Sequence, residues 1–350
     1  MPAASSRLRP SATLAALPLL ALAQSPLKPL HSFPLTALAP AGNLSKFDHL
    51  LFDAQAGALY VSAKAINTFV ALDAADGKVR HSRALASPQG VALSKTGQLW
   101  VGSDDGGNLT CVDPDDFTVK HVFHFTADTD DVHVDPYNGN LYVSSGDAAS
   151  GGVAGGQAMI VEVWPGVPLV HAHNLFTAHV EGFALVPDSP FIVASTPDDG
   201  VINVLDKGSN KITAKWAVAA PLAGVTPLIF DNATQVVLAA ARTPGALAVF
   251  DFAAGGKLLA TVACECGDAD DISFDAASKT VFISSGAVAG QYEGSITAFR
   301  QVDRATYTVL GQTRPAGKTH TFDAKSGRLF TAVPDSGSGA SIEVYQLPPQ

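Results

Sequence analysis

The stretch DDVHVDPYNGNLYVSSGD, residues 130–147, decides the fold because a close copy, DDISFDAASKTVFISSG, stands at residues 270–286. Each copy has an acidic pair, an apolar strand that ends at Asp, a turn, and a second apolar strand. Apolar residues alternate with small or polar ones in both strands, which is the period of a packed β-sheet. Two such copies, so far apart in one chain, predict a repeat protein.

Seven such units can be aligned along the chain, and they start near residues 48, 89, 130, 181, 226, 270 and 318. The starts are 41 to 51 residues apart (89−48 and 181−130 at the extremes), close to the roughly 40 to 50 residues of a four-stranded propeller blade. Gly-rich insertions, GDAASGGVAGGQA in the third unit and GAVAGQYEG in the sixth, account for the two longest spacings and are predicted loops.

The seventh unit has only three strands before the chain ends, whereas the segment PLKPLHSFPLTAL, residues 26–38, belongs to no unit. This segment can supply the missing outer strand and close a ring without open sheet edges. We therefore predict an all-β fold, a single seven-bladed β-propeller over residues 24–350. A β-sandwich or two smaller β-domains are disfavoured because no linker-like change in composition divides the chain.

Residues 1–23 have the features of a secretory signal peptide: Arg7 and Arg9, an apolar run at residues 11–23, and an A-x-A cleavage site that ends at Ala23. The alternative is an uncleaved anchor, but the run is shorter than the roughly 20 residues that cross a bilayer. We expect a secreted, extracellular or periplasmic monomer with no membrane span. The net charge of −10 and the lack of a basic run exclude a nucleic-acid partner.

Three sequons, at Asn43, Asn108 and Asn232, would accept glycans in a eukaryotic host. The three cysteines are too few for a disulfide framework, so the core must hold the fold. Cys264 and Cys266 could pair or bind a soft metal, but we favour a strand in which both alternate into a packed sheet.

Several motifs resemble the YncE-like, YVTN-type β-propeller proteins, many of which are exported. They are LYVSAKAINTFVALDAADGKV (59–79), LASPQGVAL (85–93), DTDDVHVDPYNGNLYVSSGD (128–147), GDADDISFDAASKTVFISSG (267–286) and KSGRLFTAVP (325–334). The resemblance covers residues 48–347 and implies the propeller fold, but the motifs specify blades and no single reaction unites the family. LWVGSDD and FIVASTP depart from the plainest YVTN consensus.

The first strand of each blade lines the central channel of a propeller, so the first residue of each unit should meet the others at one channel mouth. These residues are Asp48, Gln89, Asp130, Glu181, Thr226, Asp270 and Lys318, and the next position adds His49, Asp131 and Asp271. Converging carboxylates need compensation by a bound cation, by a built-in counter-ion such as Lys318, or by shared protons. Alternatively, the acidic residues only solvate a wide mouth or cap turns.

We therefore predict a propeller that binds a small ligand, a cation or a protein partner at an acidic channel mouth. The predicted site residues are Asp48, His49, Gln89, Asp130, Asp131, Glu181, Asp270, Asp271 and Lys318. A Ca²⁺ ion, the one cofactor considered, would bind to Asp130, Glu181 and Asp270.

Two other functions remain open. One is a metal-assisted hydrolase or lactonase, or an acid–base lyase or isomerase, at the same site. The other is a non-catalytic platform for protein interactions. No catalytic residue is assigned, and G-x-S-x-G, P-loop and H-E-x-x-H motifs are absent. Among the histidines, His49, His133 and His320 belong to first strands and suit metal binding or proton transfer, whereas His179 is expected on the rim.

Overall fold

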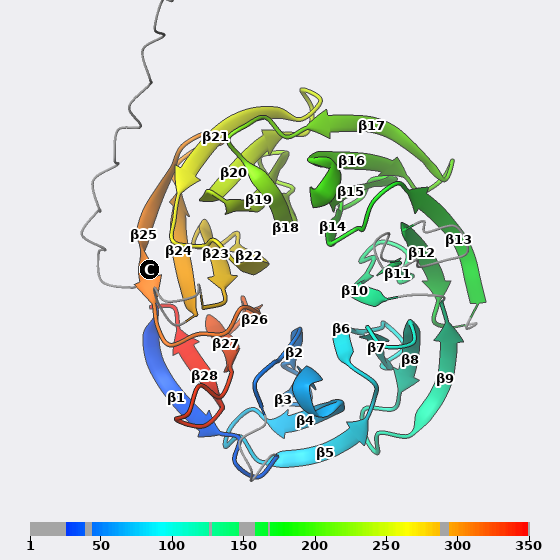
Figure 1. The fold of residues 1–350 in the computed structure, drawn as a ribbon, viewed down its shortest axis with the longest axis vertical. Helices are drawn as coiled ribbons and strands as arrows, with labels where there is room; N and C mark the ends of the chain where they lie inside the picture. The colour runs from blue at the N-terminus through cyan, green and yellow to red at the C-terminus, as the bar shows by residue number, and fades with distance from the viewer. Residues whose placement is uncertain are drawn as a thin grey trace, which may run out of the picture.

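Seven four-stranded antiparallel sheets surround a central channel in the computed structural model (Figure 1). The structure describes residues 26–38, 44–125, 128–146, 158–166, 169–287 and 294–348. In six sheets the strands follow the order of the sequence, in the seventh the N-terminal strand is added at the outer edge, and the first strand of each unit is innermost. The predicted all-β, seven-bladed propeller is therefore confirmed.

The first three blades follow one another around the ring. Blade 1 comprises β2 (Leu50–Asp53), β3 (Ala58–Ala63), β4 (Thr68–Asp73) and β5 (Val79–Ala84), with a short 3₁₀ turn, η1 (Lys64–Ile66), between β3 and β4. Blade 2 comprises β6 (Pro88–Leu93), β7 (Leu99–Ser103), β8 (Asn108–Val112) and β9 (Val119–His124). Blade 3 comprises β10 (Thr129–Val134), β11 (Leu141–Ser145), β12 (Ala158–Trp164) and β13 (Leu169–Phe176).

The other four blades complete the ring. Blade 4 comprises β14 (Gly182–Leu185), β15 (Phe191–Thr196), η2 (Pro197–Asp199), β16 (Val201–Asp206) and β17 (Lys211–Ala217). Blade 5 comprises β18 (Ala223–Asp231), β19 (Val236–Thr243), β20 (Gly245–Asp251) and β21 (Lys257–Ala263), and blade 6 comprises β22 (Ala269–Asp275), β23 (Thr280–Ser285), β24 (Ser295–Gln301) and β25 (Tyr307–Thr313). Blade 7 comprises β26 (His320–Asp323), β27 (Arg328–Val333), β28 (Ser341–Gln346) and β1 (Lys28–Pro34).

Blade 7 joins the two ends of the described chain. Strand β1 pairs antiparallel with β28, from Lys28 opposite Gln346 to Pro34 opposite Ser341. Phe33 packs into the core cluster shared by blades 7 and 1. The N-terminal segment thus supplies the outer strand that the repeat count assigns to it, and it covers the edge that β28 would otherwise expose.

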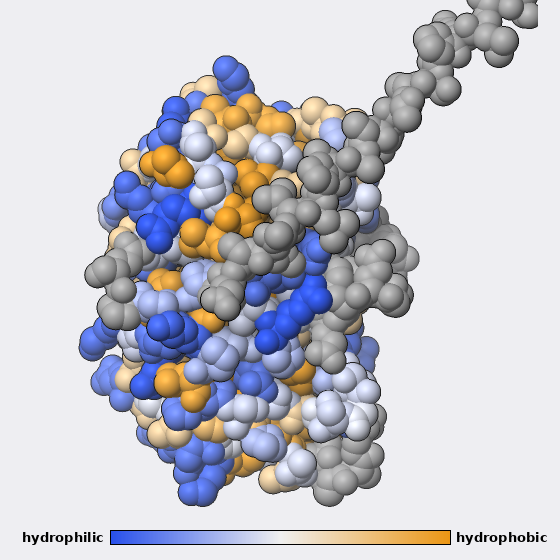
Figure 2. Space-filling view, turned by 90° about the vertical axis from the view of Figure 1, so that its left-hand side faces the viewer, coloured by the Kyte–Doolittle hydropathy of each residue, from blue (hydrophilic) through white to orange (hydrophobic). Residues whose placement is uncertain are grey.

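The core lies between blades, because each sheet packs both faces against its neighbours. The second strands are almost entirely buried, as in ALYVSA of β3 and TVFISS of β23. Outer strands alternate or are mostly exposed, as in β5 and β17. The outer wall in Figure 2 accordingly shows separate apolar patches among hydrophilic residues.

Two details of the inner strands position the channel mouth. Strands β6, β10, β18 and β22 each contain a register shift near their start, where a bulge takes residues out of the ladder and re-aims their side chains. At Gly90, a Cβ atom would lie 2.1 Å from the backbone oxygen of Asp130, so blades 2 and 3 meet too closely there for any side chain.

The structure corrects the prediction for the cysteine pair. Cys264 and Cys266 lie beyond the end of β21 rather than within a strand, and they form a disulfide. Cys111 is free and buried. The predicted signal peptide, residues 1–23, and most of the two Gly-rich insertions lie outside the described residues. Within those residues, no helix has the length and apolar character to cross a membrane.

Candidate functional site at the channel mouth

The first residues of all seven repeat units line one cavity of about 190 Å³ at one end of the channel. This convergence follows from the ring, because each inner strand starts at the same height. Seven of the nine predicted site residues lie here: Asp48, His49, Gln89, Asp130, Glu181, Asp270 and Lys318. The other two, Asp131 and Asp271, line a second cavity of about 420 Å³ on the other side of His49.

The mouth is lined by charges of both signs and is not simply acidic. Among the residues that the structure describes, five carboxylates line the cavity: Asp48, Asp128, Asp130, Glu181 and Asp270. Four permanent cations line it as well: Lys46, Lys64, Arg242 and Lys318. Most of the negative charge in the mouth is therefore neutralised by lysine and arginine side chains of the protein itself, one of the three forms of compensation that the sequence suggested.

Two cations neutralise one half of the mouth. Arg242 Nη1 lies 2.7 Å from Glu181 Oε1, and Nη2 lies 2.7 Å from Asp270 Oδ1. Lys318 Nζ lies 2.5 Å from the other oxygen of Asp270. Burial alone would raise the pKa of Asp270, but the charges of Lys318 and Arg242 outweigh it and lower that pKa. Glu181 and Asp270 are therefore already paired with protein cations.

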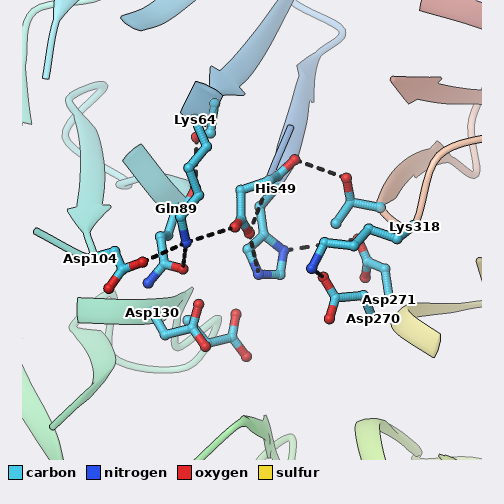
Figure 3. Close-up of polar contacts among 12 residues, drawn as sticks. His49, Lys64, Gln89, Asp104, Asp130, Asp270, Asp271 and Lys318 are labelled. Carbon is cyan, nitrogen blue, oxygen red and sulfur yellow. Dashed lines mark hydrogen bonds and ion pairs between the residues drawn. The ribbon is translucent and has the colours of Figure 1, made fainter. Parts of the chain in front are cut away.

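A third cation serves blades 1 and 2. Lys64 Nζ lies 2.9 Å from Asp104 Oδ2 and 3.4 Å from Asp48 Oδ2, and it donates to Gln89 Oε1 at 2.5 Å. Burial would lower the pKa of Lys64, but Asp48 and Asp104 outweigh burial and raise it. Figure 3 shows this group on one side of His49, with Lys318 on the other.

Lys64 and Arg242 were missed at the sequence level, although both occupy the same position in the repeat. The ladder pairs Leu59 with Phe52 in blade 1 and Val237 with Phe230 in blade 5. Each cation stands five residues after that paired residue of the second strand (64−59 and 242−237). The repeat alignment could therefore have predicted both cations, from the end of the second strand rather than from the start of the first.

One corner of the mouth has no lysine or arginine partner within salt-bridge distance in the described chain. His179 Nδ1 donates to the Gly146 carbonyl at 3.0 Å, which directs Nε2 towards Asp130 Oδ2 at 3.8 Å and Glu181 Oε2 at 3.5 Å. Asp128 lies in the same corner and accepts a hydrogen bond from Gln89. His179 therefore lies in the mouth, and the expectation that it lies on the rim is wrong.

The unbalanced charge of this corner shifts its pKa values. Burial and the charge of Asp130 raise the pKa of Asp128 to about 7. Burial also raises the pKa of Asp130, against the opposing influence of His179. Burial would lower the pKa of His179, but Asp130 and Glu181 outweigh it and raise that pKa to about 9.

His49 lines both cavities, as do Glu181 and Asp270. Its Nε2 lies 3.7 Å from Asp48 Oδ1, and its Nδ1 lies 3.9 Å from Asp271 Oδ2. Burial would lower the pKa of His49, but the charges of Asp48, Asp131, Asp271 and Asp130 raise it to about 9. Burial raises the pKa of Asp271 to about 7, although His49 opposes this shift.

Two sets of ligand atoms lie close enough together to hold a metal ion. Asp128, Asp130 and His179 form one set, and Asp48, His49 and Asp130 form the other, with the atoms of each set within 4.8 Å of one another. Both sets share Asp130 and include an imidazole. The predicted oxygen-only set of Asp130, Glu181 and Asp270 is a different one, and Arg242 bridges two of its members; the Ca²⁺ prediction stays untested.

The second cavity contains the other two first-strand histidines. His133 Nε2 lies 2.8 Å from Asp131 Oδ2, and the charge of His133 outweighs burial and lowers the pKa of Asp131. His320 is buried, and its two ring nitrogens lie within hydrogen-bond distance of Ser273 and Ser284.

Two of the three sequons are described, and neither asparagine lines either cavity. Asn108 begins β8, and its Oδ1 lies 2.7 Å from His124 Nδ1. Asn232 is exposed in the turn after β18. Asn43 falls outside the described residues. Glycosylation stays a prediction.

Solved structures resemble this chain in fold but hardly in sequence. Kuenenia stuttgartiensis hydrazine synthase matches with a TM-score of 0.71 and 13% identity over 86% of this chain and 96% of that chain. A chain of a mitotic checkpoint complex has a TM-score of 0.71 and 14% identity over 99% of both. Virginiamycin B lyase from Staphylococcus aureus, in selenomethionine-substituted form, matches with a TM-score of 0.70 and 10% identity over 91% of this chain and 99% of that chain.

No protein-family model matches the sequence, and no curated protein matches it either. The structural matches support a propeller family, and at these identities they carry the fold and nothing about function.

Proposed function

We propose that the protein is an exported, YncE-like propeller that binds a small polar ligand at the channel mouth, through a divalent transition-metal ion held by Asp128, Asp130 and His179. The repeat motifs over residues 48–347 and the leader at residues 1–23 support the family and the export. The metal set is supported by the charge distribution of the mouth.

The observation that carries the proposal is that this corner alone keeps carboxylates without a lysine or arginine, among the described residues of the mouth. Glu181 and Asp270 are paired with Arg242. Asp128 and Asp130 instead have raised pKa values, which a divalent cation would reverse.

The donor chemistry favours a transition metal over Ca²⁺. Ca²⁺ prefers six to eight oxygen ligands, whereas an imidazole with two carboxylates suits ions such as Zn²⁺ or Mn²⁺. The hydrogen bond from His179 Nδ1 to the Gly146 carbonyl is the kind that orients a metal-binding histidine. Three protein ligands leave coordination positions open towards the cavity, where a small ligand can bind.

Calorimetric titration of metal-stripped protein with Zn²⁺, Mn²⁺ and Ca²⁺ tests this proposal. We expect one Zn²⁺ or Mn²⁺ site, with affinity lowered at least about 100-fold in Asp130→Asn and His179→Gln. His179 carries a proton at pH 7.5 when metal-free, because its pKa is raised to about 9, so binding should release protons and the heat should depend on the buffer.

Asp270→Asn separates the two predicted metal sets. It removes a carboxylate that belongs only to the oxygen-only set, so it should leave Zn²⁺ affinity within about threefold. His133→Gln, a channel histidine outside both sets, controls for general effects. Ca²⁺ binding that Asp270→Asn abolishes and His179→Gln leaves intact would overturn the proposal.

A further inference from the structure

Three hydrogen bonds form a continuous relay beside the 420 Å³ cavity, and none of the proposed metal ligands takes part in it. Ser273 Oγ lies 2.7 Å from His320 Nε2, and His320 Nδ1 lies 2.8 Å from Ser284 Oγ. Ser284 Oγ lies 2.7 Å from the backbone carbonyl oxygen of Lys318. His320 and Ser284 are buried, whereas Ser273 is half-buried and lines the cavity.

The carbonyl at the end of the relay fixes the direction of every hydrogen bond in it. A carbonyl can only accept, so Ser284 must donate its single hydroxyl proton to Lys318. Ser284 Oγ can then only accept from the ring, which places the proton of a neutral His320 on Nδ1. Nε2 is left with its electron pair and accepts the hydroxyl proton of Ser273.

His320 stays neutral across the physiological pH range. Burial lowers its pKa to about 3, and the nearby charge of His49 adds to the effect. Asp271 accepts a hydrogen bond from the backbone N–H of His320 at 3.2 Å. The two ring nitrogens of His320 instead bond to the two serines. A hydroxyl that donates to an unprotonated imidazole, itself oriented by a third group, has the geometry of an activated serine nucleophile. The lowered pKa also makes His320 a weaker base than an ordinary histidine.

We propose that Ser273 accepts an acyl group from a small ester in the 420 Å³ cavity, with His320 as its general base. Ser273 Oγ forms a bond to the ester carbonyl carbon, and His320 Nε2 takes the hydroxyl proton. The bond from that carbon to the alcohol oxygen then breaks, and the alcohol leaves with the proton from Nε2. In the second half, His320 Nε2 takes a proton from water as the water oxygen bonds to the acyl carbon. The bond from that carbon to Ser273 Oγ then breaks, the carboxylic acid leaves, and Nε2 returns the proton to the Ser273 hydroxyl.

The cavity and the relay together define the class of substrate. A cavity of 420 Å³ suits a small molecule. Its lining combines apolar residues, such as Leu50, Leu228 and Phe322, with polar ones, such as Asp131, His133 and Asp271. A hydroxyl rather than a carboxylate orients His320, and loss of the carboxylate's role costs a serine protease about 10⁴-fold, so an activated ester is the appropriate probe.

p-Nitrophenyl acetate, followed by peptide mapping of the full-length protein by mass spectrometry, tests this proposal. We expect one acetyl group per chain, on Ser273, with a matching release of nitrophenolate. Ser273→Ala should abolish that label, and His320→Gln should slow its formation at least about 100-fold. Variants are compared only after their melting curves show a folded protein.

Thr321 provides a matched control. It pairs with Phe330 as Ser273 pairs with Phe282, so both hold the same position in the repeat, and both line the cavity. Thr321→Ala should leave acetylation of Ser273 unchanged. An unmodified Ser273 in the wild type, or acetylation that is equally fast in His320→Gln, would overturn the proposal, as would a label on Thr321 in place of Ser273.

Ser284 is a positioning residue in this scheme, and its role has a spectroscopic test. The ¹⁵N resonances of the His320 ring should show a protonated Nδ1 and an unprotonated Nε2 in the wild type. Ser284→Ala removes the acceptor for Nδ1, so the ring should populate both tautomers and Ser273 should be acetylated more slowly. A wild-type ring that is protonated on Nε2 would contradict the proposed direction of the relay.

Discussion

Arg242 is the residue of the mouth whose removal has the clearest energetic consequence. Its guanidinium pairs with Glu181 and Asp270 at 2.7 Å each and donates from Nε to the Ala269 carbonyl at 2.8 Å. Removal of one partner from a buried ion pair costs roughly 3 to 5 kcal/mol. Because the Arg242 side chain is 25% exposed and Lys318 still pairs with Asp270, we expect Arg242→Met to cost about 3 kcal/mol.

The assay is thermal unfolding at two pH values. For a chain of this length, about 3 kcal/mol corresponds to a drop in Tm of about 4 °C at pH 7.5. In the wild type the folded pKa of Asp270 is lowered, so this group stabilises the fold above its unfolded pKa, and the effect is lost as the pH falls through its folded pKa. The difference in Tm between variant and wild type should therefore shrink at pH 3, below the unfolded pKa of about 3.9.

Arg80→Met is the matched control. Arg80 pairs with one carboxylate, Asp73 at 2.8 Å, where Arg242 pairs with two, and it likewise donates to a carbonyl, Ala56 at 2.8 Å. It lies on an outer strand and is 34% exposed. Surface pairs of this kind contribute about 1 kcal/mol or less. If Arg242→Met melts within about 1 °C of Arg80→Met at pH 7.5, or if its deficit is the same at both pH values, the reasoning is refuted.

Three further predictions concern the ring, His49 and the cysteines. Deletion of residues 26–38 removes the buried Phe33 and exposes the edge of β28, so Tm should fall by about 10 °C or more; an unchanged melt would contradict closure by β1. The folded pKa of His49, about 9, exceeds its unfolded value, so its stabilising contribution is full below about pH 6.5 and is lost as the pH rises through 9. His49→Gln should therefore flatten the fall in Tm between about pH 6.5 and 9.5. An unaltered slope of Tm against pH would disprove this. Denatured, unreduced protein should titrate one thiol, Cys111, and reduced protein three, because Cys264 and Cys266 are paired; three thiols before reduction would contradict the pairing.

The fold and the set of residues at the mouth could be read from the sequence for one physical reason. A propeller maps position in the repeat onto position in the ring, so residues at one alignment position meet at one height of the channel. Asp48, Asp130 and Lys318 come together for this reason, although up to 270 residues separate them (318−48). The same rule applies to the ends of the second strands, where Lys64 and Arg242 were overlooked because the sequence reasoning followed only the first strands.

Other features of the site depend on local geometry that alternation does not encode. At the register shifts in β10 and β22, Asp130 and Asp270 line the mouth, whereas Asp131 and Asp271 line the other cavity, which Asp270 also borders. Nothing in DDVHV or DDISF marks such a bulge. His179 lies in the connection before β14, where no strand period applies. Its place in the mouth depends on the Gly146 carbonyl, a partner 33 residues away.

The two ends of the channel are electrostatically linked through His49. The charges of four carboxylates raise the pKa of His49, and Asp130 is one of the four. A divalent cation on Asp130 would neutralise that charge and add repulsion of its own, so the pKa of His49 should fall when the proposed metal binds. His49 also opposes the rise in the pKa of Asp271, and the loss of its proton would therefore raise that pKa further. Because Asp271 accepts the backbone N–H of His320, the charge beside the serine relay depends on what occupies the mouth.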